Sequence, residues 1–282
     1  MTRALVEEAT LADAVARANA GDRAALEHVV SAIQDDVFRL AIRMTAHPED
    51  AEDASQEILV KVITRLDSFR GESSVRTWAY RIAVRHLLDR KKSRVEALAL
   101  DFERFGKDLL DGLAAEPDPD PLMAEEVKLG CTLAMLTCLD REHRVAYVLT
   151  DVFDLPHEVA AAICEVSEDT HRQRVSRARR ALEAFTTSFC GLVEPDAPCK
   201  CSKRVVKAEA LGRVHRGRRQ LADSVQAAKE EMESLHTTAR LLRSHPAYRA
   251  SARVVSTVRS MLTRDLHLLT EKSENGQNNG AF

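Results

Sequence analysis

An arginine-rich segment, SEDTHRQRVSRARRAL at residues 167–182, contains the side chains whose types and spacing most clearly indicate a function in this sequence. Five arginines fall within nine positions, at Arg172, Arg174, Arg177, Arg179 and Arg180. A guanidinium can pair bidentately with guanine, and the amide of Gln173 can pair in the same way with adenine. Flanking cations suit phosphates, which supply most of the salt-dependent affinity for DNA. The segment therefore predicts DNA binding; the alternative is an exposed arginine-rich helix that pairs with neighbouring acids.

Helical spacing gives this segment two faces. Val175, Ala178 and Leu182 recur at intervals that place them on one side, so we expect them to be buried. Ser167 is a good N-cap for the helix. The apolar segment before it, PHEVAAAICEV at residues 156–166, could pack across it and complete a helix-turn-helix. In that motif the second helix enters the major groove and reads base edges.

A second group of chemically active side chains is the C-x8-C-x-C pattern of Cys190, Cys199 and Cys201. Zinc ligands are more often two to four residues apart, but a loop containing two prolines could fold back on itself. Three thiolates with His215 or another histidine could then hold zinc, and two close thiolates would suit copper(I). A redox switch and plain reduced cysteines are the alternatives. Cys131 and Cys138 share a helix face among Leu and Met, which indicates core positions.

The composition predicts an all-α protein. The 282 residues include 30% charged and only 4% aromatic side chains, which favours two or three small helical domains over one core. The net charge of −3 does not exclude nucleic-acid binding, because local patches decide it. No apolar run approaches about 18 residues and no signal peptide is evident, so we expect a cytoplasmic protein with reduced cysteines. No Gly-rich phosphate loop or Ser-His-Asp set indicates an enzyme.

Apolar periodicity predicts the helices that position these residues. Helical patterns cover residues 22–46, 51–69, 75–94 and 124–153. Residues 98–124 are acidic and contain three prolines that alternate with acids, so we expect an extended linker there. After the cysteines, two amphipathic segments at about 203–243 and 247–270 precede a polar tail that we expect to be disordered.

Two blocks together resemble a known family. PEDAEDASQEILVKVITRLDSFRGESSVRTWAYRIAVRHLLDRKK resembles the N-terminal domain of bacterial extracytoplasmic-function (ECF) RNA polymerase sigma factors, and DREHRVAYVLTDVFDLPHEVAAAICEVSEDTHRQRVSRARRAL resembles their C-terminal, promoter-reading domain. The resemblance covers about residues 20–190. It implies an N-terminal segment (1–19), a region 2 domain (20–97), an acidic linker (98–124), a region 4 helix-turn-helix domain (125–189), a Cys-containing helical extension (190–270) and a disordered tail (271–282).

The resemblance also implies roles for particular residues. The DAEDASQE motif would bind the β′ clamp helices of core RNA polymerase through Asp50, Asp53, Gln56 and Glu57. The segment after it would melt the −10 element through Arg70, Ser73, Ser74, Trp78, Arg81, Arg85 and Arg90. The arginine-rich helix would read the −35 element through Thr170, Arg172, Gln173, Arg174, Ser176, Arg177 and Arg180. The partners implied are promoter DNA and core polymerase, including its β flap.

Three positions have alternative interpretations. Trp78 could stack on an extruded base or be a core aromatic, while Tyr80 lies with core positions and is expected to be buried. Glu165 stands where the turn of the helix-turn-helix usually carries glycine. Because glutamate lacks the freedom of glycine at positive φ, we expect a differently shaped turn.

The C-terminal extension exceeds the minimal two-domain sigma factor. We favour a regulatory role, in place of or beside a separate anti-sigma factor; extra polymerase or DNA contacts and a stabilising helical hairpin are the alternatives. Overall we predict a sigma factor that requires no cofactor, with zinc or copper(I) at the C-terminal cysteines as an option. The rival is a stand-alone helix-turn-helix regulator that responds to metal or redox state.

Overall fold

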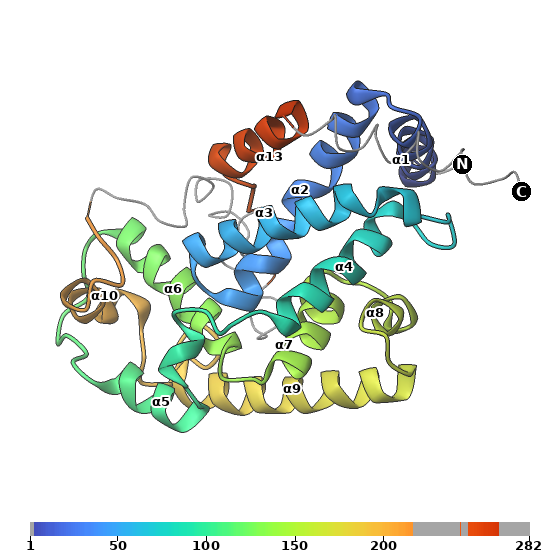
Figure 1. Cartoon of the computed structure of the whole chain (residues 1–282). Helices are drawn as coiled ribbons and strands as arrows, with labels where there is room; N and C mark the ends of the chain where they lie inside the picture. Colours follow the sequence, from blue (N-terminus) through green and yellow to red (C-terminus); the bar gives the residue numbers. More distant parts are fainter. Residues whose placement is uncertain (1–2, 217–242, 244–247, 265–282) are drawn as a thin grey trace, which may run out of the picture.

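The computed structural model describes residues 3–216, 243 and 248–264, and the fold is given for these ranges (Figure 1). Their regular structure is helical, which confirms the all-α prediction. Apart from an isolated bridge between Cys190 and Cys199, no strand pairing occurs in these ranges. No helix within them is long and apolar enough to cross a bilayer. The predicted tail at 271–282 and most of the segment 217–247 lie outside the described residues.

The first domain is built from α1 (Arg3–Asn19), α2 (Arg23–Thr45), α3 (Pro48–Thr64) and α4 (Val75–Asp89). Local chemistry fixes where these helices begin. Asp22 and Ser74 accept backbone hydrogen bonds at the N-termini of α2 and α4, and Pro48 occupies the first turn of α3. The three helices expected from periodicity are confirmed. α4 ends earlier than predicted, because the basic run after Asp89 offers no apolar side chain to the core.

The second domain contains α6 (Pro121–Leu136), α7 (Arg141–Tyr147), the π-helical turn η3 (Val148–Val152), α8 (His157–Ile163) and α9 (Glu168–Phe189). Asp140 caps α7 by accepting a hydrogen bond from the His143 amide at 2.9 Å. This cap divides the stretch of predicted helical patterning at 124–153 into α6 and α7. The buried face predicted for the arginine-rich helix is confirmed, because Val175, Ala178 and Leu182 are at most 1% exposed.

Part of the predicted linker is a helix, α5 (Phe102–Leu110). Its Phe105 ring stacks on Phe185 of α9 with ring centroids 5.4 Å apart. Gly106 permits this close approach, since a Cβ there would lie 2.6 Å from the Phe189 ring. The prediction of an extended linker is wrong for this stretch, because the prolines that disfavour helix come after it. Within the predicted linker, residues 99–101 and 111–120 lie outside helices.

Two helices of the C-terminal extension are described, α10 (Cys201–Ala210) and α13 (Ala252–Arg264). α10 packs on α6, where Val205 joins Met123 and Val127 in a small separate apolar cluster. α13 lies against α3, and its Val254 and Val258 are buried there (Figure 1). The extension therefore contacts both domains.

The two domains pack on each other, and one hydrophobic cluster runs through both of them. The expectation of separate small cores is therefore wrong. Glu96, in the short helical turn η2 (Glu96–Leu98), accepts hydrogen bonds from Arg141 at 2.7 Å and Arg144 at 2.9 Å on α7. Burial by itself would raise the pKa of Glu96, but the hydrogen bonds from Arg141 and the Ser93 amide and the charge of Arg144 lower it to about 2. This polar junction fixes α7 against the end of the first domain.

Candidate nucleic-acid and polymerase interfaces

α8 and α9 form a helix-turn-helix whose turn contains Glu165. The Val166 amide donates to the Ala161 carbonyl at 3.1 Å, and Glu165 adopts φ 56°. This left-handed conformation is the one that glycine usually supplies, at a cost of roughly 1–2 kcal/mol for another residue. The expectation of a differently shaped turn is therefore wrong, because the helix-ending hydrogen bond holds glutamate in the glycine conformation.

The exposed face of α9 is basic. It presents Arg172, Gln173, Ser176, Arg177 and Arg180, all in the positions predicted for the −35 surface. Arg172 donates to Glu168 one turn earlier, with Nε 3.0 Å from Oε1. Within the described part of the chain, neither Arg177 nor Arg180 makes an ion pair. These two guanidiniums are therefore the ones most available to bind an anionic or hydrogen-bonding ligand.

Thr170 and Arg174, also predicted to contact the −35 element, have partners inside the domain. The Thr170 amide donates to Ser167 Oγ at 3.2 Å, and Arg174 pairs with Glu142 at the start of α7. Arg179, on the flank of α9, donates to Asp151 from Nε and Nη2 at 2.9 and 2.7 Å. These contacts hold α9 against the rest of the domain and so position its exposed arginines.

His171 supports α9 from beneath and was not singled out from the sequence. It is fully buried, with Nε2 2.9 Å from Thr150 Oγ1, and its ring meets His157 edge-on. Burial, followed by the charges of His157 and Arg174, lowers the pKa of His171 to about 4. The only sequence signal was its spacing, four residues before the buried Val175.

The loop and helix start predicted to bind the −10 element combine structural and exposed residues. Ser74 Oγ accepts from the Thr77 amide at 3.0 Å, so this hydroxyl caps α4. Trp78 is half-buried, with its ring edge-to-face to Phe69 at 5.6 Å between centroids, while Tyr80 is in the core as predicted. In the adjacent loop, Arg70 is exposed and Ser73 is half-buried.

Two arginines of α4 face the helix-turn-helix. Arg81 Nε donates to the Ala162 carbonyl at 3.2 Å, and Arg85 Nη2 donates to the Glu165 carboxylate at 2.6 Å. Arg90 has a buried Nη1 with no hydrogen-bond partner among the described residues. The predicted −10 surface is therefore partly covered by the second domain in this arrangement.

The acidic motif on α3 divides into exposed and tethered residues. Asp53 and Glu57 are exposed, one turn apart, and point away from the buried Ile58, as the helical spacing predicts. Asp50 accepts from the Arg94 amide at 2.8 Å. Gln56 is half-buried, and its Nε2 finds no hydrogen-bond partner within the described ranges. The exposed pair is thus the least buried part of the predicted polymerase surface, although Asp53 Oδ1 lies 3.8 Å from Arg253 on α13.

The three C-terminal cysteines lie close together along a folded-back loop. The Cys199 amide donates to the Phe189 carbonyl at 3.1 Å, and the Gly191 amide donates to the Cys199 carbonyl at 2.9 Å. All six cysteines are free thiols. As the side chains stand, no three His, Cys, Asp or Glu residues in the described ranges are arranged to hold a metal ion.

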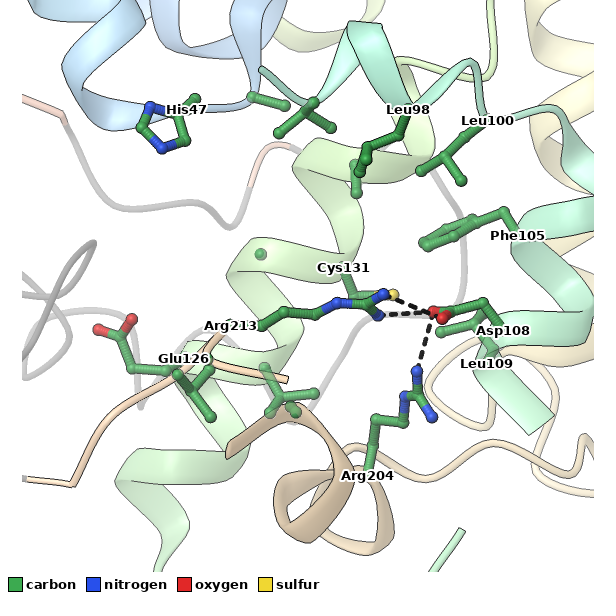
Figure 2. A pocket seen from close by; sticks show the side chains of 18 of the residues that line it. His47, Leu98, Leu100, Phe105, Asp108, Leu109, Glu126, Cys131, Arg204 and Arg213 are labelled. Carbon is green, nitrogen blue, oxygen red and sulfur yellow. Dashed lines mark hydrogen bonds and ion pairs between the residues drawn. The ribbon is translucent and has the colours of Figure 1, made fainter. Parts of the chain in front are cut away.

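A cavity of about 320 Å³ lies where α5, α6 and α10 meet. Figure 2 shows Asp108 in it, paired with Arg204 at 2.8 Å and Arg213 at 2.6 Å, and Cys131 beside them. Burial by itself would raise the pKa of Asp108, but the two arginines outweigh burial and lower it. No residue predicted to bind DNA or polymerase lines this cavity, so it is separate from both surfaces.

Residues 29–96 match the family model of Sigma-70 region 2, and residues 129–182 match that of Sigma-70 region 4. The ECF RNA polymerase sigma factor SigE of Mycolicibacterium smegmatis is 32% identical over 173 residues, which cover 58% of this chain and 64% of that protein, slightly under two thirds of its length. The ECF RNA polymerase sigma-E factor of Escherichia coli is 31% identical over 175 residues, covering 60% and 90%. A structure of CnrH in complex with the cytosolic domain of CnrY aligns with a TM-score of 0.43 at 25% identity, covering 61% of this chain and 94% of that one.

Two matched helical regions and a basic helix-turn-helix define a DNA-binding protein of the Sigma-70 class. Within that class, the chain belongs to the ECF family of RNA polymerase sigma factors, which direct promoter-specific transcription initiation. The region 2 match disfavours a stand-alone helix-turn-helix regulator, because such a regulator needs no second domain of this kind. The extension beyond residue 190 lies outside both matched regions.

Proposed function

We propose that this sigma factor binds core RNA polymerase through the exposed acidic face of α3, melts the −10 element with α4 and reads the −35 element with α9. The observation that carries this assignment is the exposure of Asp53 and Glu57 in the same chain as Arg177 and Arg180. Carboxylates suit a basic surface such as the β′ clamp helices, and guanidiniums suit guanine edges and phosphates. The helix-turn-helix domain would also contact the β flap. None of these steps requires covalent chemistry or a cofactor from this chain.

Melting the −10 element fits the chemistry of α4. Opened DNA needs a stacking surface and cations for its phosphates. Trp78 is half-exposed, and Arg81 and Arg85 follow it on the same stripe. Arg81 and Arg85 both contact the helix-turn-helix in this structure. The two domains would therefore have to separate before α4 and α9 could bind their promoter elements together.

A regulatory role for the extension is supported by α13. Arg253 on α13 lies 3.8 Å from the carboxylates of both Glu52 and Asp53 on α3. Val254 and Val258 bury the apolar side of α13 beside this acidic face. A polymerase element that binds α3 would therefore compete with α13, and a separate anti-sigma factor would compete for the same face.

Run-off transcription with purified core polymerase tests both parts of this function on the full chain. Replacing Val254 and Val258 together by Asp would introduce charges into the α13–α3 contact, and Ser256→Asp on the exposed side of α13 is the matched control. We expect tighter core binding and more transcript from the double variant than from the control. Equal output from the two would refute regulation by α13.

Charge reversal on α3 tests the polymerase surface separately. Asp53→Lys with Glu57→Lys should weaken core binding by roughly tenfold or more and lower the transcript accordingly in either α13 background. Transcript undiminished by this reversal would refute the assignment of α3 as the polymerase-binding helix, whatever the outcome for α13.

A further inference from the structure

The cysteines of this chain are gathered by tertiary structure into a pattern that their sequence spacing does not show. The bridge between Cys190 and Cys199 sets these residues side by side on adjacent backbones. The amides of Val193 and Glu194 both donate to the Cys190 carbonyl, at 3.0 and 2.9 Å, so the chain turns tightly just after the first cysteine. The loop between the two cysteines is thereby closed by backbone hydrogen bonds, and the Lys200 ammonium also donates to the Pro195 carbonyl within it.

The third and fourth cysteines arrive from the two helices that pack together next to this loop. Cys201 begins α10 and packs against the apolar cluster that α10 shares with α6. Cys131 lies on α6, half-buried, in the wall of the cavity beside Arg204 of α10 (Figure 2). Three segments of the chain therefore bring thiols to one junction: α6, the end of α9 with its loop, and α10.

Packing makes these thiols neighbours. α10 packs on α6 along the apolar cluster against which Cys201 lies, and Cys131 stands one helical turn beyond Val127 of that cluster. Cys199 belongs to the main hydrophobic cluster of the protein, and Cys131 packs against the same cluster. None of the four donates a hydrogen bond to any described residue. Thiols that are at least half-buried and have no hydrogen-bond partner among the described residues are available to bind a soft dication as thiolates.

The surroundings would balance the charge of such a site. A divalent zinc with four thiolates has a net charge of −2, which is costly to bury without nearby cations. Arg204 is 2% exposed and lines the same cavity as Cys131, and Lys128, three residues before Cys131 on α6, is 3% exposed. Each cation is also held by an acid, through the Arg204–Asp108 and Lys128–Glu125 pairs.

We propose that Cys131, Cys190, Cys199 and Cys201 form a four-thiolate site for Zn²⁺ that fastens the start of the C-terminal extension to the first helix of the helix-turn-helix domain. The fourth ligand is thus Cys131 and not His215, which is exposed. The sulfurs do not surround a common centre as they stand, so metal binding requires changes of cysteine rotamer, which move each sulfur about a single bond. Four thiolates favour zinc over copper(I), which two close thiolates would suit.

Metal analysis of the purified full-length protein, reconstituted with zinc under reducing conditions and then dialysed, tests this site. We expect one zinc per chain. Serine substitution of Cys131, Cys190, Cys199 or Cys201, one at a time, should abolish stoichiometric retention. Cys138→Ser and Cys164→Ser are matched controls, since both residues are half-buried and lie outside the group, and they should keep the full zinc content. These outcomes do not depend on polymerase or DNA binding.

Cobalt(II) in place of zinc gives a second measurement that does not depend on how well a variant folds. The unsubstituted protein should show a tetrahedral cobalt spectrum whose thiolate charge-transfer intensity corresponds to four sulfur ligands. Less than one zinc per chain after reconstitution, full zinc retention by Cys131→Ser, or a cobalt spectrum with fewer sulfur ligands would overturn the assignment. Stoichiometric copper(I) in place of zinc, or a disulfide between Cys190 and Cys199 that persists under the reducing conditions of the reconstitution, would overturn it as well.

Discussion

The guanidinium of Arg85 on α4 lies 2.6 Å from the carboxylate of Glu165, the residue that forms the turn of the helix-turn-helix. One ion pair thus joins the surface proposed to melt the −10 element to the motif proposed to read the −35 element. Both side chains are more than half exposed, at 61% and 55%. Solvent therefore screens the pair, so little free energy is needed to separate the two side chains.

Breaking this pair from either side should have opposite effects on DNA binding. Glu165→Gln releases Arg85 and is expected to raise affinity for single-stranded −10 DNA by up to about fivefold, since an exposed pair contributes at most about 1 kcal/mol. Arg85→Ala also breaks the pair but removes a DNA cation, so it should lower the affinity. Fluorescence anisotropy with labelled single strands measures both. The proposal that this ion pair restrains Arg85 would be disproved if the two variants shifted the affinity in the same direction.

Arg177 and Arg180 are expected to dominate recognition of the −35 element. Replacing either by Ala should weaken binding to duplex −35 DNA by about 1–3 kcal/mol if it contacts a base, or reduce the salt dependence by roughly one counterion if it contacts a phosphate. Arg179→Ala is the comparison, because Arg179 is committed to Asp151. The main effect of Arg179→Ala should be a lower melting temperature, with only a minor effect on the affinity for −35 DNA. Salt-dependent binding curves measure the affinity, and thermal melts measure the stability. A larger loss of affinity for Arg179→Ala than for Arg177→Ala or Arg180→Ala would show that α9 binds DNA by another face.

The acidic face of α3 should govern polymerase affinity. Asp53→Lys together with Glu57→Lys is expected to weaken binding to core polymerase by roughly tenfold or more, which corresponds to at least about 1.4 kcal/mol. Glu103→Lys, an exposed acid on α5, is the control and should leave binding unchanged. Competition binding against a labelled sigma factor provides the measurement. Equal losses for the two variants would indicate a general charge effect instead of a specific surface.

Acid should destabilise the helix-turn-helix domain through His171. Its folded-state pKa of about 4 lies below its ordinary value, so the unfolded chain binds more protons between these two values. Stability is therefore full above the unfolded pKa and falls as the pH drops toward the folded one. The expected loss is about 2 kcal/mol between about pH 7 and about pH 5. Denaturant titrations should show a smaller pH dependence for His171→Gln, and an unchanged slope would contradict this origin.

Glu96 should be the residue on which the domain junction depends most. Its carboxylate is 7% exposed, and it neutralises Arg144, which is 2% exposed. Glu96→Gln would leave a buried guanidinium uncompensated, which typically destabilises a protein by about 3–5 kcal/mol. Glu103→Gln on the surface should cost less than about 0.5 kcal/mol. Chemical denaturation compares the two, and similar stabilities would show that the junction contributes little.

The sequence by itself determined the helical class, the helix-turn-helix and the basic face of α9. These features follow from apolar spacing, caps and charge within single segments, and such local preferences hold whatever the rest of the chain does. The exposure of Asp53 and Glu57 followed from the same helical spacing. The role of Ser74 as a cap could also have been read locally, because it stands directly before the first apolar residue of α4.

Only the tertiary structure decided which segments contact one another. α5 is a helix within a stretch expected to be extended, because Phe105 finds Phe185 across the fold. Arg85 meets Glu165, although about 80 residues separate them along the chain. Likewise α6, which carries Cys131, packs on α10, which begins at Cys201, although about 70 residues separate these two cysteines. Such pairings depend on how apolar faces dock, and many dockings satisfy the same pattern of buried and exposed positions. Local sequence can therefore specify each helix and its faces, while the contacts between helices select which functional residues are covered and which are left free.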